Sequence, residues 1–261
     1  MSATSNALKA NAEQGKDSLI GYFPIGYPTL EDSIEAVVAM CEEGVDVLEL
    51  GVPYSDPVMD GIVIQEATQE ALQNGFKLRF LFPALKDITS RVDTPILVMT
   101  YWNPVLQYGV ENFATDLKSA GGAGLITPDL IPDEAQVWLE QSDKHDLDRV
   151  FLATPTSTQE RVDVATKLSR GFVYAVSTMG ITGERQEVDQ NARQVVASVR
   201  AANATQNVAV GIGISTAEQA SQVNDYSDGA IVGSVFVKAY QQGGLEALRA
   251  KVREIVAGLR K

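Results

Sequence analysis

The chain has 261 residues, of which 45% are hydrophobic and 21% are charged, and this suffices to bury one large core. Its formal net charge of -13 would repel a phosphate backbone, so we set nucleic-acid binding aside. Cys41 is the single cysteine, which excludes an internal disulfide and a multi-thiolate zinc site and favours the reducing cytoplasm. No run approaches the roughly 18 apolar residues of a membrane helix, and the N-terminus lacks an apolar signal segment, so we expect neither membrane insertion nor secretion.

Eight short apolar or β-branched runs recur along the chain, with helical patterns between them. Each run is apolar enough for a strand that is covered on both faces. The runs are SLIGYFP from residue 18, DVLELGV from 46, PILVMTY from 95, GLITPD from 124, RVFLATP from 149, GFVYAVS from 171, NVAVGIG from 207 and GAIVGS from 229. This alternation, in a chain close to the typical length of about 250 residues, predicts a parallel (β/α)8 TIM barrel. We expect residues 1–261 to form a single domain of this kind.

The segments between the runs have the periodicity of helices. From Thr29 to Glu43 an apolar stripe that includes Cys41 ends at Gly44, which predicts a helix with Cys41 packed in the core. The last helix has one apolar face, made of Leu245, Leu248, Val252, Ile255, Val256 and Leu259. Extra helices are expected at the N-terminus and, after the second run, near 61 to 74 and 78 to 91. The polar loop after the sixth run, residues 177–189, has the composition of a mobile lid.

Glu49 is the first candidate for chemistry. Side chains alternate along a strand, so Leu48 and Leu50 should meet the helices while Glu49 points into the barrel, near the strand end where barrel enzymes assemble their sites. A structural ion pair would need a cation, and the eight runs contain no Lys or Arg except Arg149 at the bottom of the fifth. Because a buried unpaired carboxylate is costly, we favour a functional Glu49. We expect burial to raise its pKa, which suits a group that gives and takes protons.

The loop over residues 51–61 holds two more carboxylates, Asp56 and Asp60. On spacing alone, an aspartate before glycine is more often a turn or a helix cap than a catalytic group, and Asp56 in Ser-Asp-Pro has weaker grounds still. A magnesium site at Glu49, Asp56 and Asp60 stays open as an alternative. Magnesium prefers few carboxylates plus substrate phosphates, so we predict no metal site.

Glycines at the ends of the last three runs predict a phosphate site. They are Gly183 in GITG, Gly211 and Gly213 in GIGIS, and Gly233 followed by Ser234. In barrels, the loops after the last strands and a short helix N-terminus commonly hold phosphate through backbone N–H groups. Such a site needs no surface cations, so an acidic protein can still bind a phosphorylated substrate.

Several other chemistries lack their residues. His145, the only histidine, lies at a helix end, and the strand runs offer no lysine for a Schiff base. Carboxylate acid-base catalysis on a phosphate ester remains. Several apolar or aromatic residues near strand ends would each be expected to pack in the core, and as a group they could line a pocket for an apolar ring. These residues are Phe23, Met99, Tyr101, Leu125 and Tyr174.

The sequence resembles the tryptophan synthase alpha subunit family over nearly its whole length. The most specific motif is LELGVPYSDPVMDG, residues 48–61, with support from GLITPDLIPDEA, from STMGITG, and from GIGIS followed by GAIVGS. MTYWNPVLQYG and GLITPDLIPDEA look most like actinobacterial members. The resemblance implies a lyase that uses no cofactor and cleaves indole-3-glycerol phosphate to indole and glyceraldehyde 3-phosphate.

Site residues follow from the resemblance position by position. It implies that Glu49 protonates indole C3 and deprotonates the glycerol hydroxyl next to the ring, while Asp60 accepts a hydrogen bond from the indole N1–H. The implied phosphate ligands are Gly183, Gly213, Gly233 and Ser234, and Thr182 would bridge the lid to Asp60. Tyr174 and Tyr101 would line the substrate pocket. Where the family usually has proline after Asp-Gly, this chain has Ile62.

The resemblance also implies a partner. Family members pass indole through a tunnel to a beta subunit that carries pyridoxal phosphate, in an alpha2-beta2 tetramer, and Asp56 and the lid would couple the two sites. Three alternatives stay open: a stand-alone lyase that releases indole, a catalytically silent activator of a beta subunit, and another phosphate-binding barrel such as a thiamine phosphate synthase or sugar-phosphate isomerase. Retention of Glu49 and Asp60 argues against the silent activator, and residues 48–61 disfavour the other barrels.

Overall fold

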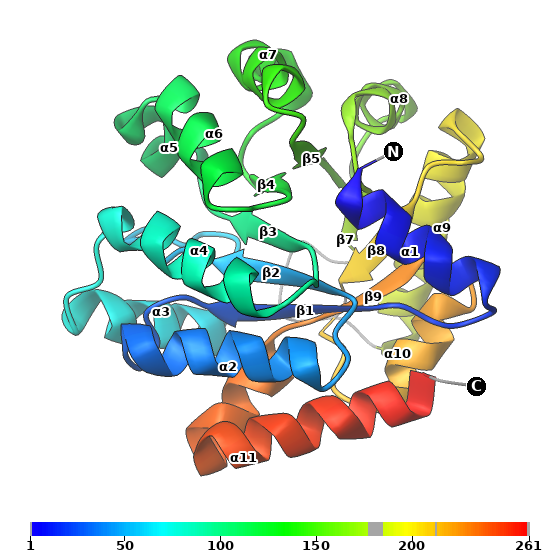
Figure 1. Ribbon diagram of the computed structural model, residues 1–261. Helices are drawn as coiled ribbons and strands as arrows, with labels where there is room; N and C mark the ends of the chain where they lie inside the picture. The colour runs from blue at the N-terminus through cyan, green and yellow to red at the C-terminus, as the bar shows by residue number, and fades with distance from the viewer. Residues whose placement is uncertain (1, 177–184, 212, 260–261) are drawn as a thin grey trace.

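The computed structural model describes residues 2–176, 185–211 and 213–259, with the backbone alone over 185–189. Parallel strands form a barrel that helices surround (Figure 1), which confirms the predicted (β/α)8 TIM barrel. The strands of the described part are β1 (Leu19–Pro24), β2 (Val47–Gly51), β3 (Ile96–Met99), β4 (Gly124–Ile126), β5 (Asp148–Val150), β6 (Leu152–Ala153), β7 (Val173–Val176), β8 (Val208–Gly211) and β9 (Gly229–Val232). The α-helices are α1 (Ala3–Glu13), α2 (Leu30–Glu42), α3 (Ile62–Gln73), α4 (Leu81–Arg91), α5 (Trp102–Tyr108), α6 (Val110–Ser119), α7 (Gln136–Lys144), α8 (Gln159–Leu168), α9 (Arg185–Ala202), α10 (Ala217–Asn224) and α11 (Ser234–Leu259), with 3-10 turns η1 (Leu78–Phe80) and η2 (Pro132–Glu134).

The fifth predicted run is divided into two strands, which is why eight runs give nine strands in the described chain. Its first part, β5, pairs with β4, and its second part, β6, pairs with β7. Phe151 lies between them, and its backbone N–H donates to Ser169 Oγ at 3.3 Å. The sheet order is β5-β4-β3-β2-β1-β9-β8-β7-β6, so the two strands at its ends, β5 and β6, are consecutive in the chain and are joined at Phe151.

The predicted helices are present at their expected places. Thr29 caps α2 by accepting the Asp32 N–H at 3.1 Å, and Gly44 takes a φ of 104° just after the helix. Cys41 packs, partly buried, against the main core. The extra helices are α1, α3 and α4. Gly243 and Gly244 interrupt α11, so a short segment that begins at Ser234 is distinct from the final amphipathic segment.

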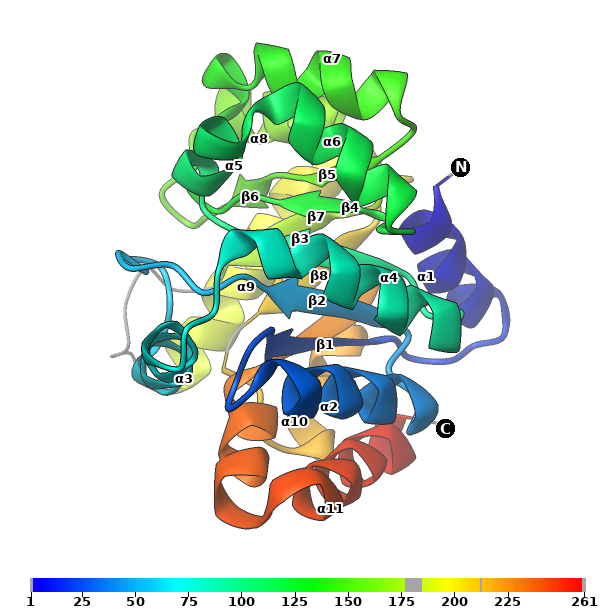
Figure 2. The same cartoon turned by 60° about the vertical axis from the view of Figure 1, so that its left-hand side comes forward.

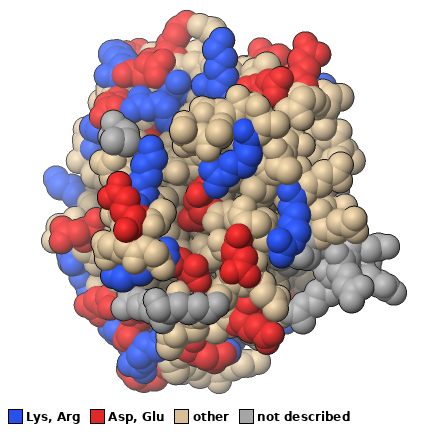
Figure 3. Space-filling view, turned by 90° about the vertical axis from the view of Figure 1, so that its right-hand side faces the viewer, with Lys and Arg blue, Asp and Glu red and all other residues tan. Residues whose placement is uncertain are grey.

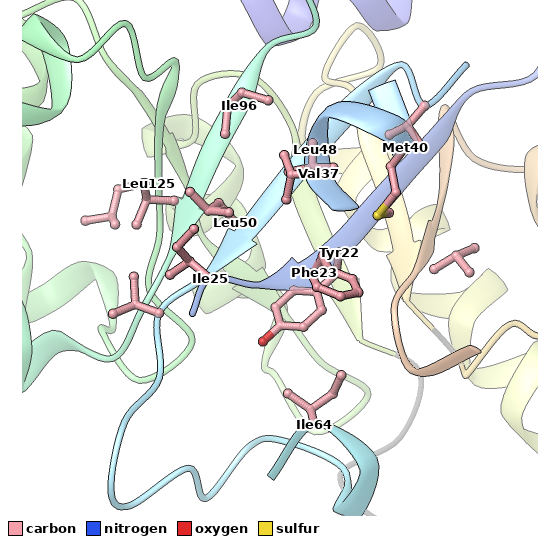
Figure 4. Packing of buried hydrophobic residues seen from close by; sticks show 14 of the residues in the cluster. Tyr22, Phe23, Ile25, Val37, Met40, Leu48, Leu50, Ile64, Ile96 and Leu125 are labelled. Atoms are coloured by element: carbon pink, nitrogen blue, oxygen red, sulfur yellow. The ribbon is translucent and has the colours of Figure 1, made fainter. Parts of the chain in front are cut away.

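Side-chain alternation along the strands divides the core into two parts. Leu48 and Leu50 pack between the sheet and the helices, together with residues such as Phe23 and Val37 (Figure 4). Val47 faces the barrel interior, where Leu8 of α1 joins a second cluster. Burial of one such leucine stabilises a fold by about 1.5–3 kcal/mol. Helix α1 thus covers the N-terminal ends of the strands, opposite the end toward which the arrows of β1 and β2 point (Figure 2).

Acidic and basic side chains are intermixed over the face shown in Figure 3, which has no continuous basic patch. In the described part of the chain, no helix is both long enough and apolar enough to cross a membrane.

Candidate active site

A cavity of about 680 Å³ opens at the C-terminal end of the barrel, within the usual size range of small-molecule sites. Strand residues that face the barrel interior form its floor, and the loop between β2 and α3 forms part of its rim. The floor and wall include Tyr22, Glu49, Met99, Ile126, Tyr174 and Ile231. The cavity thus lies at the end of the barrel where such folds carry their chemistry.

Glu49 lies on the floor of this cavity and is 1% exposed. Its Oε1 has no hydrogen-bond partner among the described residues. Burial raises the pKa of Glu49 to about 8, because a charged carboxylate loses its hydration there. At neutral pH the group is mostly a neutral acid that can donate a proton.

Asp60 lies on the rim, in the loop that enters α3. Burial raises the pKa of Asp60 to about 6, and a hydrogen bond from the Tyr101 hydroxyl acts in the opposite direction. Tyr101 Oη also accepts the Met59 backbone N–H at 2.9 Å. Two carboxyl groups on one cavity therefore have different pKa values, and at pH 7 Glu49 can act as an acid while Asp60 is ionised.

The five residues considered for an apolar pocket do not line the cavity together. Phe23 and Leu125 are buried in the outer core, as expected for each of them singly, whereas Met99 and Tyr174 line the cavity. Neighbouring residues of a strand face opposite sides, and Tyr22 and Ile126 also line the cavity. Tyr22 is the residue that sequence reasoning missed. It is the partner of Glu49 in the β1–β2 register, so correct pairing of the two strands would have found it.

Glycines and a helix N-terminus form another part of the cavity wall. Gly213, Gly233 and Ser234 line it, and α11 begins at Ser234. The first N–H groups of a helix have no partner within the helix and attract anions. Gly213 has a φ of 66°, and a Cβ there would meet nothing within 4 Å, so its backbone is open to a ligand.

A glycine is needed at position 211 for a different reason. A Cβ at this position would overlap the Tyr174 ring and hydroxyl. Gly211 therefore makes room for Tyr174, which itself lines the cavity. Thr182 and Gly183 lie outside the described residues.

Tyr101 and Asp56 are placed away from the cavity floor. Tyr101 is buried behind the rim loop, where its hydroxyl contacts Asp60 and Met59. Asp56 is exposed and accepts a hydrogen bond from the Ser55 hydroxyl at 2.6 Å. In the described ranges no group of three His, Cys, Asp or Glu side chains is arranged to hold a metal ion. Glu49, Asp56 and Asp60 therefore do not form such a group.

Large apolar side chains are exposed around the same end of the barrel. All follow β2, β3 or β4 in the chain: Val58, Met59, Ile62, Leu106, Ile131 and Val137. Val58 is 78% exposed, and Leu106 is 52% exposed. Val58, Met59 and Ile62 lie close together in the chain, at the entrance to α3.

Comparisons with known proteins agree with this geometry. A family model described as tryptophan synthase alpha chain matches residues 8–259. The tryptophan synthase alpha chain of Leifsonia xyli subsp. xyli is 57% identical over 99% of this chain and 98% of its own, and that of Mycobacterium avium is 50% identical over 97% and 93%.

Solved structures are similar as well. Mycobacterium tuberculosis tryptophan synthase has a TM-score of 0.94 and 48% identity, with 100% of this chain and 99% of that chain covered. The tryptophan synthase complex from Pyrococcus furiosus has a TM-score of 0.83 and 35% identity, with 93% and 99% covered. With a family model that spans nearly the whole length and relatives at 50% identity or more, this chain belongs to the tryptophan synthase alpha chain family.

Proposed function

We propose that this chain cleaves indole-3-glycerol phosphate to indole and glyceraldehyde 3-phosphate, as the alpha subunit of a tryptophan synthase. The observation that carries the proposal is the neutral, buried Glu49 on the floor of a cavity whose rim holds Asp60. Family membership supports the same conclusion. The chain needs no cofactor for this step, because both proton transfers can be made by carboxyl groups.

Glu49 carries both proton transfers in the proposed mechanism. The neutral acid first protonates C3 of the indole ring, which leaves positive charge on the ring nitrogen. The Glu49 carboxylate then removes the proton from the glycerol hydroxyl next to the ring while the C3–C bond breaks. The bonding electrons return to the ring and restore indole, the hydroxyl carbon becomes the aldehyde of glyceraldehyde 3-phosphate, and Glu49 is again neutral.

Asp60 supports this sequence from the rim. Its carboxylate accepts a hydrogen bond from the ring N1–H, and that bond becomes stronger as positive charge develops on the ring. Stabilisation of charge that appears only in the transition state raises the rate rather than the affinity. The raised pKa of about 6 still leaves Asp60 ionised at pH 7, as this role requires.

The remaining predicted residues bind the rest of the substrate. We assign the phosphate to Gly213, Gly233 and Ser234, together with Gly183, and the indole ring to the aromatic wall that includes Tyr174. Thr182 is proposed to link the lid to Asp60. Tyr101 acts mainly through its hydrogen bond to Asp60, because its ring lies behind the rim loop.

The proposed partner is a beta subunit that carries pyridoxal phosphate. Exposed apolar side chains on the segments that follow β3 and β4, such as Leu106 and Ile131, would give it a docking surface, and one similar structure is a tryptophan synthase complex. We propose that Asp56, which is exposed on the rim loop, couples the two subunits. We further propose that residues 1–261 act as a single domain, in a cytoplasmic alpha2-beta2 tetramer that binds no nucleic acid.

One assay separates this function from its alternatives. The chain is incubated with indole-3-glycerol phosphate, with and without a matching beta subunit, and indole and glyceraldehyde 3-phosphate are measured. We expect slow release by the chain alone and strong activation by the beta subunit. Full turnover without a partner would favour the stand-alone lyase, activation of the beta subunit without cleavage would favour the silent activator, and no cleavage under either condition would refute the proposal.

A further inference from the structure

Gln65 connects the Asp60 loop to helix α3. Its Nε2 donates to the Asp60 carbonyl oxygen at 2.8 Å and approaches the Pro57 carbonyl oxygen at 3.4 Å. Both partners are acceptors, so the amide nitrogen must face them. We infer that Gln65 is a positioning residue that holds Asp60 in the geometry needed for cleavage, an inference that rests on the proposed function.

The helix end of this connection is rigid. Gln65 lies in the first turn of α3, where its backbone N–H donates to Gly61 O at 3.0 Å. The helix is anchored by Ile64, which is 6% exposed, and by Ala67 and Ala71, which are fully buried in the main core. The Gln65 side chain, which extends from this turn, can therefore hold the preceding loop in place through its hydrogen bonds.

The loop end has little packing of its own. The Asp60 N–H donates to Pro57 O at 3.1 Å and closes a tight turn. The two residues inside the turn, Val58 and Met59, are 78% and 41% exposed. Hydrogen bonds rather than buried apolar contacts therefore hold this turn.

Two residues from different elements bind Asp60. Tyr101, at the end of β3, bonds the Asp60 side chain and the Met59 N–H, and Gln65 bonds the Asp60 main chain from α3. If the main chain is released, the carboxylate can still bind Tyr101 but no longer has a fixed distance to the ring nitrogen. A misplacement of about 1 Å can cost roughly 100-fold in rate.

The loss should appear in catalysis rather than in folding. Gln65 is only partly buried, so water can replace its amide on the two carbonyl oxygens. Hydrogen bonds that water can replace contribute little to stability. A purely structural role would instead lower stability and leave Asp60-dependent chemistry unchanged.

The test compares Gln65→Met with Gln69→Met in the complex with the beta subunit. Methionine keeps the length of the side chain and removes the donor, and Gln69 is exposed on the same helix. We expect Gln65→Met to lower kcat for indole release about 10- to 100-fold, with unfolding in urea close to that of the wild type. Gln69→Met should match the wild type in both assays.

The effect of Gln65→Met in an Asp60→Asn enzyme shows whether Gln65 acts through Asp60. In Asp60→Asn, the further change Gln65→Met should alter the single-turnover rate less than about twofold, because residues of one network are not additive. An equal loss in both backgrounds would overturn the inference, as would a Gln65→Met rate equal to the wild type. If the wild type itself releases no indole, the proposed function fails instead.

Gln65→Glu provides an independent check and replaces Gln65→Met if that variant does not fold. The ionised side chain cannot donate to the two carbonyl oxygens, whereas the protonated acid can. The loss of kcat in Gln65→Glu, relative to the wild type at the same pH, should therefore become smaller as the pH falls toward the pKa of the new carboxyl group. A deficit that stays constant from pH 8 to pH 5 would contradict the assigned hydrogen bonds.

Discussion

The ring of Tyr22 occupies the space that a Cβ on Gly51 would need. Tyr22 pairs with Glu49 in the β1–β2 register, and Gly51 follows two residues after Glu49 on the same face of β2. At its other end, Tyr22 Cβ lies 3.2 Å from the position of a Cβ on Gly233. Tyr22 thus spans the cavity floor from Gly233, in the proposed phosphate site, to Gly51 on β2, the strand that carries Glu49.

Gly51→Ala should therefore damage both the fold and the site. The added methyl group overlaps the Tyr22 hydroxyl and ring, and overpacking of this kind costs about 1–3 kcal/mol of unfolding free energy. We expect indole release to fall together with the urea midpoint. The double variant Gly51→Ala, Tyr22→Leu should recover stability but not activity, and a Gly51→Ala enzyme with wild-type stability would show that Tyr22 does not occupy this space.

The pH dependence of kcat/KM should be bell-shaped. Glu49 must begin as a neutral acid, and its pKa is about 8, so activity should fall as the pH rises through that value. Asp60 must be ionised, and its pKa is about 6, so activity should also fall as the pH drops through that value. The optimum is expected near pH 7, with apparent pKa values that belong to the pair. Initial rates from pH 5 to pH 9 test this, and Asp60→Asn should abolish only the acidic limb.

Ile62→Pro should stabilise the protein. Ile62 is the first residue of α3 and is 58% exposed, and Gly61 before it has φ -71° and ψ 159°, a conformation that suits the residue before proline. Proline is favoured at the first helical position. It also lowers the conformational entropy of the unfolded chain, which adds about 0.4–1 kcal/mol to the free energy of unfolding. Urea unfolding should show this gain, with activity retained. The control Gln69→Pro, at an exposed position in the interior of α3, should instead lower the free energy of unfolding by about 3 kcal/mol. A less stable Ile62→Pro would mean that the α3 start differs from the one described.

Ile131→Glu should weaken association with the beta subunit. Ile131 is 44% exposed, in the segment that leads from β4 to η2, and a charge in the centre of an apolar interface typically costs more than 1 kcal/mol. About tenfold more beta subunit should be needed for half-maximal activation, whereas indole release by the isolated chain should not change. Ala10→Glu, on α1 at the other end of the barrel, is the matched control. Equal titration curves for the two variants would place the interface elsewhere.

Strand positions and the inward direction of Glu49 could be predicted from the sequence because both depend on local patterns, namely apolar runs and side-chain alternation. Tyr22 and Ile126 were not identified as cavity residues because a run of apolar residues does not reveal which of two neighbours faces the barrel. The division of the fifth strand at Phe151 depends on pairing with two different neighbours, which only the closed barrel defines.

The roles of the glycines also needed three dimensions. Gly211 and Gly213 are two residues apart in one motif, yet the first makes room for Tyr174 and the second faces open space. Likewise, the hydrogen bond from Gln65 to Asp60 depends on how the loop enters α3. No spacing rule distinguishes Gln65 from the exposed Gln69 one turn later.

The central claim is that Glu49 donates and accepts the protons that are transferred during the cleavage. The variant Glu49→Gln tests this claim most directly. The pKa of Glu49 rises from 4.5 to about 8 on folding. Its ionisation therefore opposes folding increasingly as the pH rises from about 4.5 to about 8. The amide removes this penalty, so at pH 7 the variant should be at least as stable as the wild type. With the beta subunit and indole-3-glycerol phosphate present, single-turnover indole formation should fall by about 10²- to 10⁴-fold, and a folded Glu49→Gln enzyme that forms indole at the wild-type rate would contradict the account.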